Sequence, residues 1–388
     1  MAIRSAIIGV GQTKHGRRDD VNFIELVYEA VKAAIADAGI SPDDIEAVAQ
    51  GSMPTPMEGV NANHLYLSDA MTSSGKPLIR TATCGSVGMS IAQLANSHVT
   101  SGMFDIVLAV GAQKISEGDA QGTMGTISDP WIQRPFQGGA PGAFSMQAHQ
   151  YTHRYNLPEE RVREAAARIS VNHHGNAMDN PYAHIRVRVT MEDVLKSRII
   201  AYPTRLLDVC PQSDGACAVI FASEEIAKKL GRKVAWVKGT GYAGDEHFFG
   251  DSDKIVWQSA IIAAKKAYYM AGIKNPRKEL DVAEVYNPFT YQELVFYECL
   301  GFCDFGEACK LVEDGVVLRG GELPVTPSGG VLCTTPIGAT GLISVGESAL
   351  QVTGRAGDHQ IAGAKIAMAH AMGGIAQFNG IMILSSES

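Results

Sequence analysis

Two patterns of hydrophobic and polar residues alternate at the start of the chain. An apolar run from Ser5 to Gly11 ends in Gly-Val-Gly and predicts a short buried strand. From Phe23 to Ala38 apolar residues recur at helical spacing and stop at Gly39, a residue type that commonly ends helices. After a polar turn comes a second apolar run, Ile45 to Gln50. Strand, helix and strand in this order indicate a βαβ unit.

The same order of patterns returns in the second half of the chain. Val234 to Gly241 is again an apolar run that ends among glycines. Ile261 to Ala271 has helical spacing and stops at Gly272, and Leu280 to Tyr286 supplies the following apolar run. A repeat of this length is too long for a solenoid and indicates an internal duplication of about half the chain.

A second pair of segments supports the duplication. Gly85-Ser-Val-Gly88 and Gly338-Ala-Thr-Gly341 each precede a helical pattern, and predicted strands follow at 104–111 and 361–369. We therefore predict an α/β fold of two duplicated halves, each with its own mixed sheet, packed face to face. The expected units are an N-terminal half (1–115 and 204–230), an insertion (116–203) and a C-terminal half (231–388).

The insertion interrupts the repeat and is rich in Gly, Gln, His and Arg. It contains one evident helical pattern, from Glu159 to Asn172. Because long excursions between core elements often carry binding residues, we interpret it as a lid or substrate-binding segment.

Cys84 lies on a Gly- and Ser-rich turn between a predicted strand (77–81) and a predicted helix (89–99). A helix N-terminus offers unpaired N–H groups and a positive dipole end, both of which favour a thiolate. A lowered thiol pKa is what makes a cysteine nucleophilic. The alternative at this point is a buried structural cysteine.

Composition excludes several classes of protein. The 388 residues are 46% hydrophobic, which is typical of a globular chain, and the net charge of −8 offers no footprint for nucleic acid. Seven scattered cysteines predict reduced thiols in a cytoplasmic protein, without a metal site. The N-terminus enters a strand without a signal peptide, and no apolar run reaches the length of a membrane span.

With these motifs in view the whole chain resembles the thiolase superfamily, in particular its bacterial and archaeal branch related to sterol-carrier-protein thiolases. Besides Cys84 and the duplication, the resemblance rests on five motifs: Asn180-Pro-Tyr-Ala183, Leu206-Leu-Asp-Val-Cys-Pro-Gln-Ser-Asp-Gly-Ala216, Ser328-Gly-Gly330, Pro336-Ile-Gly-Ala-Thr-Gly341 and Gly373-Gly374. It implies two βαβαβαββ halves in a five-layer α-β-α-β-α arrangement with a lid.

The resemblance also implies a chemistry. Thiolases cleave a 3-oxoacyl-CoA with a second CoA, or run the reverse condensation, and need CoA as substrate but no permanently bound cofactor. Cys84 would attack the 3-keto carbon and carry the acyl group. By resemblance the oxyanion hole would consist of the N–H groups of Cys84 and Gly373. The enolate that leaves needs a hydrogen-bond donor and an acid for its C2 atom.

The family residues that usually bond the leaving enolate and protonate its C2 atom are replaced here. Thr335 stands where the family has a histidine, Tyr286 where it has an asparagine or histidine, and Ala371 where it has a second cysteine. A threonine hydroxyl cannot act as a base near neutral pH, and alanine cannot transfer a proton. Other residues must do this work, or the chain is not a conventional thiolase.

The remaining catalytic candidates are His370, Cys333, Tyr286 and Asn287, the last adjacent to Tyr286. His370 precedes the family position by one residue, so in a strand it would point to the opposite face, and a hydrogen-bonded core histidine is the alternative. Cys333 lies in a shortened loop near Thr335. Tyr286 and Asn287 could each bond an enolate or simply pack.

Further candidates concern substrate binding. Thr335 could donate a hydrogen bond, and His149 of the insertion stands where the family often contacts the pantetheine arm. Arg186 and Arg188 could meet the phosphates of CoA through charge-assisted bonds, although solvated lid arginines are the alternative.

Three functions are therefore compared. The first is thiolytic cleavage of an unusual 3-oxoacyl-CoA, branched or aromatic, with benzoylsuccinyl-CoA as an example. The second is a C-acyltransferase of the same fold, and the third a degenerate scaffold subunit. The resemblance further implies a homodimeric core and a small separate partner with a zinc ribbon and an OB-type fold. We expect no nucleic-acid or membrane partner.

Overall fold

The computed structural model describes residues 3–53, 57–126, 128–131, 133–136, 139–246 and 253–388. Over these residues nine strands form one mixed sheet in the order β3-β2-β4-β7-β1-β8-β11-β10-β9. The strands of this sheet are β1 (Ser5–Gln12), β2 (Ala47–Gly51), β3 (Leu78–Thr81), β4 (Ile106–Gln113), β7 (Gly215–Ser223), β8 (Ala235–Gly244), β9 (Val282–Glu284), β10 (Ile366–Gly373) and β11 (Phe378–Ser385).

The sheet order confirms the duplication. In the N-terminal half β7 lies antiparallel between β1 and β4, and β4 is parallel to β2. In the C-terminal half β11 lies antiparallel between β8 and β10, and β10 is parallel to β9. The two halves thus share one pattern of neighbours and directions, with β1 matching β8.

One detail differs from the prediction of two separate sheets. Strands β1 and β8 pair directly, through Ala6 with Trp236 and Ile7 with Ala235. This short antiparallel contact joins the two half-sheets into one continuous sheet. A contact of two residue pairs leaves no periodic pattern in the sequence, so sequence reasoning could not foresee it.

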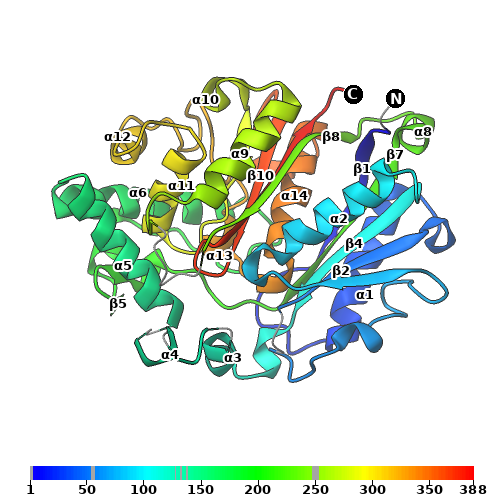
Figure 1. Ribbon diagram of the computed structural model, residues 1–388, viewed down its shortest axis with the longest axis horizontal. Helices are drawn as coiled ribbons and strands as arrows, with labels where there is room; N and C mark the ends of the chain where they lie inside the picture. Colours follow the sequence, from blue (N-terminus) through cyan, green and yellow to red (C-terminus); the bar gives the residue numbers. More distant parts are fainter. Residues whose placement is uncertain (1–2, 54–56, 127, 132, 137–138, 247–252) are drawn as a thin grey trace.

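Helices lie around the two half-sheets in layers (Figure 1). The helices are α1 (Phe23–Ala38), α2 (Val87–Thr100), α3 (Ala120–Thr126), α4 (Gln133–Phe136), α5 (Gly139–Arg154), α6 (Glu159–Ala177), α7 (Met191–Lys196), α8 (Glu224–Lys229), α9 (Gln258–Ala271), α10 (Pro276–Glu279), α11 (Thr290–Cys299), α12 (Ala308–Glu313), α13 (Gly330–Cys333) and α14 (Ile337–Thr353).

The central layer consists of α2 and α14, which pack on each other and on strands of both half-sheets. Helix α1 covers β1 and β7 from outside, and α9 covers β8 and β11. Their sequences explain this placement. The buried side of α1 carries Phe23, Leu26 and Val27, and its end at Gly39 adopts the left-handed conformation, as does Gly272 after α9.

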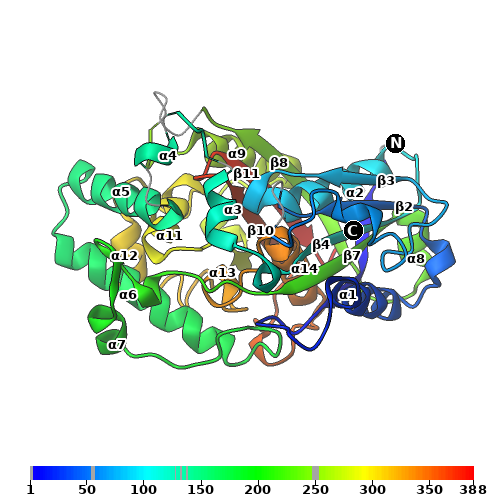
Figure 2. The ribbon, with the colours of Figure 1, turned by 90° about the horizontal axis from the view of Figure 1, so that it is seen from below.

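Helices α5, α6 and α7 of the insertion lie away from α1 and β2, at the other side of the molecule (Figure 2). Helix α6 packs on α11, α12 and α13, so the insertion rests on an excursion of the C-terminal half. The hairpin of β5 (Ile199–Ala201) and β6 (Thr204–Arg205) spans the expected boundary at residue 203.

Individual boundaries shift where turns intervene. The strand expected from Ile361 begins at Ile366, because the preceding residues form a turn in which Gly363 has a φ of 77°. In the part of the chain that the structure describes, no helix is both long and apolar enough to cross a membrane.

Candidate active site

Cys84 occupies a strained turn at the start of the central helix α2. It opens a 3-10 turn, Cys84–Ser86, that runs directly into α2. Its φ is 52°, in the left-handed region that non-glycine residues rarely adopt. The Ser86 hydroxyl donates to the Thr83 carbonyl at 2.7 Å, and the Thr83 and Ser90 hydroxyls lie 2.6 Å apart. Side-chain bonds therefore hold this cysteine in a conformation typical of functional sites.

The Cys84 side chain faces a cavity of about 150 Å³. Much of its wall is apolar and includes Met53, Met57, Met124, Phe144, Phe289 and Met372. Its polar side chains are Cys84, Cys210, Gln212, Tyr286 and Thr335. None of the described residues that line it carries a formal charge at neutral pH.

The apolar wall changes the expectation for the Cys84 thiol. Burial raises its pKa, and an N–H donated by the Gly374 backbone opposes this rise without overcoming it. The lowered thiol pKa expected from the helix N-terminus is therefore wrong for this cavity. Attack on a carbonyl then requires that the thiol proton be removed as the reaction proceeds.

Tyr286 is brought to the nucleophile by the loop after β9. A Cβ atom placed on Gly85 would lie 2.8 Å from the Tyr286 hydroxyl and 2.7 Å from the Met372 carbonyl. Glycine at position 85 therefore leaves the space that this hydroxyl occupies beside Cys84. Burial raises the pKa of Tyr286 well above its ordinary value, so the hydroxyl keeps its proton and can donate.

His370 lies behind this loop and outside the cavity. Its Nδ1 accepts the Tyr286 N–H at 3.3 Å, and its Nε2 lies 3.0 Å from Asn379 Oδ1. These partners require a neutral ring with the proton on Nε2, and burial lowers its pKa to about 4. His370 therefore has the contacts of a hydrogen-bonded core histidine, the alternative considered above, and it points away from the cavity, as the alternation of side chains along a strand favours.

We expect this neutral histidine to make the fold acid-sensitive. His370 binds a proton near pH 6.5 in the unfolded chain but only near pH 4 in the folded protein, because burial lowers its pKa. The free energy of unfolding therefore falls as the pH drops from about 6.5 to about 4. This loss in the free energy of unfolding reaches about 3 kcal/mol at the acidic end of the window. Denaturant unfolding at several pH values should show a shallower pH dependence for His370→Gln than for wild type. His149→Gln, at an exposed position, is the control; equal slopes for wild type and His370→Gln contradict the assignment.

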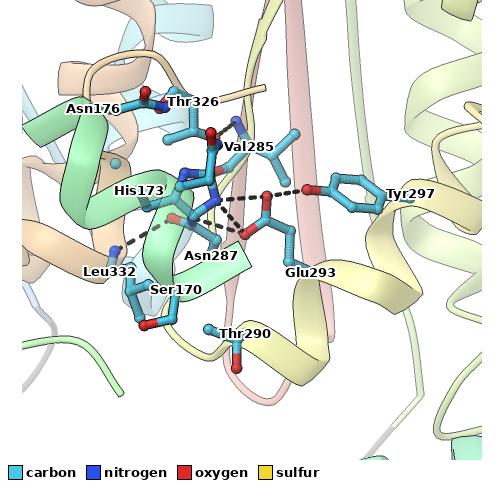
Figure 3. A network of polar contacts seen from close by, with 12 residues as sticks. Ser170, His173, Asn176, Val285, Asn287, Thr290, Glu293, Tyr297, Thr326 and Leu332 are labelled. Atoms are coloured by element: carbon cyan, nitrogen blue, oxygen red, sulfur yellow. Dashed lines mark hydrogen bonds and ion pairs between the residues drawn. The ribbon is translucent and has the colours of Figure 1, made fainter. Parts of the chain in front are cut away.

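Asn287 belongs to a buried polar network rather than to the cavity (Figure 3). Its Nδ2 donates to Glu293 at 2.9 Å, and its Oδ1 accepts the Leu332 N–H at 3.3 Å. The Glu293 carboxylate is fully buried. It also forms hydrogen bonds with His173 Nε2, at 2.9 Å, and with the Tyr297 hydroxyl. The network holds the loop that carries Tyr286. Both polar atoms of the Asn287 side chain are bonded within this network, and Asn287 does not line the cavity.

Replacing Asn287 should therefore weaken the fold more than the chemistry. Asn287→Ala leaves Glu293 and the Leu332 N–H without one partner each, which costs about 1–3 kcal/mol for each buried group. We expect a clear loss in the free energy of unfolding by urea titration, with activity of the folded fraction retained within about tenfold. Asn61→Ala, at an exposed position in a turn, is the control. A catalytic role would instead show as a stable protein that has lost its turnover.

Thr335 does line the cavity, and its hydroxyl donates to the Val331 carbonyl at 2.6 Å. The other predicted residues lie elsewhere. Cys333 is buried in a small cluster with Ala177 and Ala183. His149 is exposed on α5, its ring 5.5 Å from that of Tyr202.

The two arginines also lie outside the cavity that Cys84 faces. Arg186 and Arg188 are exposed, and Arg186 donates to the Met178 carbonyl at 2.7 Å beside a different cavity. Gly373 packs tightly on the nucleophile turn, because a Cβ there would lie 2.3 Å from the Thr83 carbonyl. The N–H that reaches the Cys84 sulfur is that of the next residue, Gly374.

Cys210 and Gln212 are cavity residues that sequence reasoning did not single out. Both belong to the Leu206–Ala216 motif, whose pattern by itself indicates only a turn from lid to core. The signal available was a cysteine inside a motif of the family. All seven cysteines are free thiols, and the described residues contain no cluster of ligands suited to a metal ion.

Two duplicated half-sheets around paired central helices, with a cysteine at the start of one helix, define the thiolase fold. Comparisons with known proteins agree. Residues 3–225 match the family model "Thiolase, N-terminal domain", and residues 241–386 match "Thiolase C-terminal domain-like". The chain belongs to the thiolase family.

Two relatives cover nearly the whole chain. It is 34% identical over 375 residues to the acetyl-CoA acetyltransferase of Methanothermobacter thermautotrophicus, covering 95% of this chain and 96% of that one. It is 31% identical to the benzoylsuccinyl-CoA thiolase subunit BbsB of Thauera aromatica, covering 95% and 94%. These relatives support acyltransferase activity for the chain.

Among solved structures, the chain is similar to that of the Ltp2-ChsH2(DUF35) aldolase. The TM-score is 0.85 with 26% identity, over 98% of this chain and 97% of that one.

Proposed function

We propose that this protein transfers an acyl group through a thioester on Cys84, cleaving a 3-oxoacyl-CoA with CoA or running the reverse condensation. The observation that supports this most directly is the placement of Cys84. Its thiol faces a largely apolar cavity from the start of the central helix, and the Gly374 N–H points at its sulfur. Water exclusion protects a thioester from hydrolysis, and backbone N–H groups stabilise developing oxyanions. CoA is the acyl acceptor in this proposal.

The cavity indicates the class of acyl group. A space of about 150 Å³ with apolar walls can hold a group about the size of benzene. This supports a branched or aromatic acyl group. Because the described lining includes no cationic side chain, a substrate with a second carboxylate, such as benzoylsuccinyl-CoA, is disfavoured.

A second candidate function is aldol cleavage of a 3-hydroxyacyl-CoA into an aldehyde and a shorter acyl-CoA. It is favoured by the likeness to the Ltp2-ChsH2(DUF35) aldolase and by Tyr286, whose hydroxyl stands beside the nucleophile turn. Such cleavage needs no acyl-enzyme and no second CoA. It takes a proton from the 3-hydroxyl group and delivers one to C2, so atoms balance without a further reactant.

Mass spectrometry separates these functions. The protein is incubated with 3-oxobutanoyl-CoA or 3-oxo-3-phenylpropanoyl-CoA and digested, and the peptide that contains Cys84 is examined for an added acyl group. We expect an acetyl or benzoyl adduct that disappears when free CoA is added. Release of aldehyde from a 3-hydroxyacyl-CoA without CoA, and without an adduct, supports the aldolase instead. Inertness toward both substrate types leaves the degenerate scaffold.

The C-acyltransferase alternative shares the first half of this chemistry. It would form the same adduct on Cys84, but free CoA would not accelerate loss of the acyl group. Measuring the decay of the isolated adduct with and without CoA therefore separates it from a thiolase.

For partners we propose a homodimeric cytoplasmic core that binds a small zinc-ribbon and OB-fold subunit. The likeness to the Ltp2-ChsH2(DUF35) aldolase, which is named for two components, supports a separate partner subunit. Light scattering of the purified chain should give twice the mass of 41.3 kDa. A monomer contradicts the homodimer.

A further inference from the structure

Cys210 reaches the cavity from the segment that returns from the insertion to the core. Its N–H donates to the Pro288 carbonyl at 3.0 Å, and the neighbouring Val209 pairs with Phe289. Backbone contacts thus hold Cys210 against the loop that carries Tyr286. Its half-buried side chain lines the same cavity as Cys84.

The cavity contains few groups that can exchange a proton. Among its described lining residues these are the thiols of Cys84 and Cys210 and the hydroxyl of Tyr286. In the proposed reaction Cys84 carries the acyl group, and the Tyr286 hydroxyl lies beside Gly85, the residue that follows the nucleophile. Cys210 is then the remaining thiol that can donate a proton to a second atom of the substrate.

Its surroundings keep the Cys210 thiol protonated and ready to donate. Burial raises the pKa of the Cys210 thiol to about 11, although a contact with the Thr335 side chain acts in the lowering direction. The Thr335 hydroxyl itself donates to the Val331 carbonyl at 2.6 Å, so its own proton is already engaged. His370 is behind the loop and bonded on both ring nitrogens.

We propose that Cys210 is the acid that protonates C2 of the departing enolate, an inference that rests on the proposed acyl transfer through Cys84. As the Cys84 sulfur bonds to C3, its thiol proton passes to the 3-oxo oxygen and forms a hydroxyl group. The C2–C3 bond then breaks, its electron pair becomes the enolate, and the Cys210 S–H proton moves to C2. The carbonyl of the thioester re-forms, and the hydroxyl proton goes to the Cys210 sulfur. In the second half reaction the CoA thiol attacks the thioester and its proton goes to Cys84, so protons balance in each half.

If Cys210 is the C2 acid, replacing it should affect two reactions of the full-length protein differently. Exchange of an acetyl group between acetyl-CoA and 3′-dephospho-CoA requires only Cys84. Exchange of the C2 hydrogens of acetyl-CoA for deuterium in D2O requires the C2 acid. For Cys210→Ala we expect C2 exchange and C–C cleavage to fall at least about 100-fold, the usual size of a general acid–base contribution. Acetyl exchange between the thiols should stay within about threefold.

Two further variants make the test decisive. Cys210→Ser keeps the size of the side chain but supplies a much weaker acid, so it should show the same separation even if Cys210→Ala folds poorly. Cys303→Ala changes another half-buried thiol, outside this cavity, and should leave both reactions intact. The proposal is overturned if folded Cys210 variants keep C2 exchange within severalfold, or lose both reactions equally.

Failure of the underlying function looks different. If wild-type protein does not exchange acetyl groups between thiols, acyl transfer through Cys84 is refuted whatever Cys210 does. If such a protein still exchanges C2 hydrogens and Cys210→Ser abolishes this, the same acid serves the aldol reaction, which releases the same kind of enolate.

Discussion

Cys84→Ala should reduce C–C cleavage with CoA by at least about 10⁴-fold, because it removes the atom that carries the acyl group. Losses of this size follow removal of a nucleophile in enzymes that use covalent catalysis. The cavity, Tyr286 and the Gly374 N–H all remain, so binding alone should persist. Chromatographic assay of the CoA esters measures the loss, and the adduct on the Cys84 peptide should vanish with it.

The strained backbone adds a second readout at the same position. Because φ is 52° at Cys84, glycine fits this turn better than any other residue. We expect Cys84→Gly to be more stable than Cys84→Ala by about 1 kcal/mol in urea unfolding, although both are inactive. Cys333→Ala, at a buried thiol outside the cavity, is the matched control and should keep its activity. Full activity of Cys84→Ala in this assay would exclude the acyl-enzyme on Cys84.

The fold was largely predictable because the duplication repeats local signals. Each half has an apolar strand and an amphipathic helix that ends at glycine, and those signals arise from short-range physics at Gly39 and Gly272. The pairing of β1 with β8 was not predictable, since it depends on how the halves meet. The same holds for the packing of the insertion on α11 and α12, which joins segments far apart in sequence.

The candidate site was predictable where the family resemblance aligns a residue with a known site position. Cys84, Tyr286 and Thr335 all line the cavity. Cys210 was missed because it reaches the site only through contacts with the 286–289 loop.

The residues proposed for binding the CoA part of the substrate lie elsewhere. His149, Arg186 and Arg188 lie outside the cavity and are exposed, as polar residues of an insertion commonly are. The raised pKa of the Cys84 thiol follows from the apolar wall, which is assembled from several distant segments, so the helix terminus alone misled the prediction.

The crossing of the two central helices gives a prediction with a large effect on stability. Gly88 of α2 and Gly341 of α14 are the corresponding glycines of the duplicated motifs, and they meet at this crossing. A Cβ on Gly88 would lie 2.2 Å from the Leu342 nitrogen and 2.8 Å from the Gly341 carbonyl carbon. Both are backbone atoms of a helix packed between two half-sheets, so neither can move aside cheaply.

Gly88→Ala should therefore lower the free energy of unfolding by about 3 kcal/mol, at the upper end of the usual cost of overpacking. The matched control is Gly175→Ala in α6, where an added Cβ meets nothing within 4 Å; it should stabilise by about 0.5–1 kcal/mol, as alanine does within a helix. Urea unfolding of both variants measures the contrast. Because Gly88 lies one turn beyond Cys84, any folded Gly88→Ala protein should also acylate more slowly. Equal stability of the two variants would show that α2 and α14 can move apart at little cost. Close packing of their backbones would then not explain why both positions carry glycine.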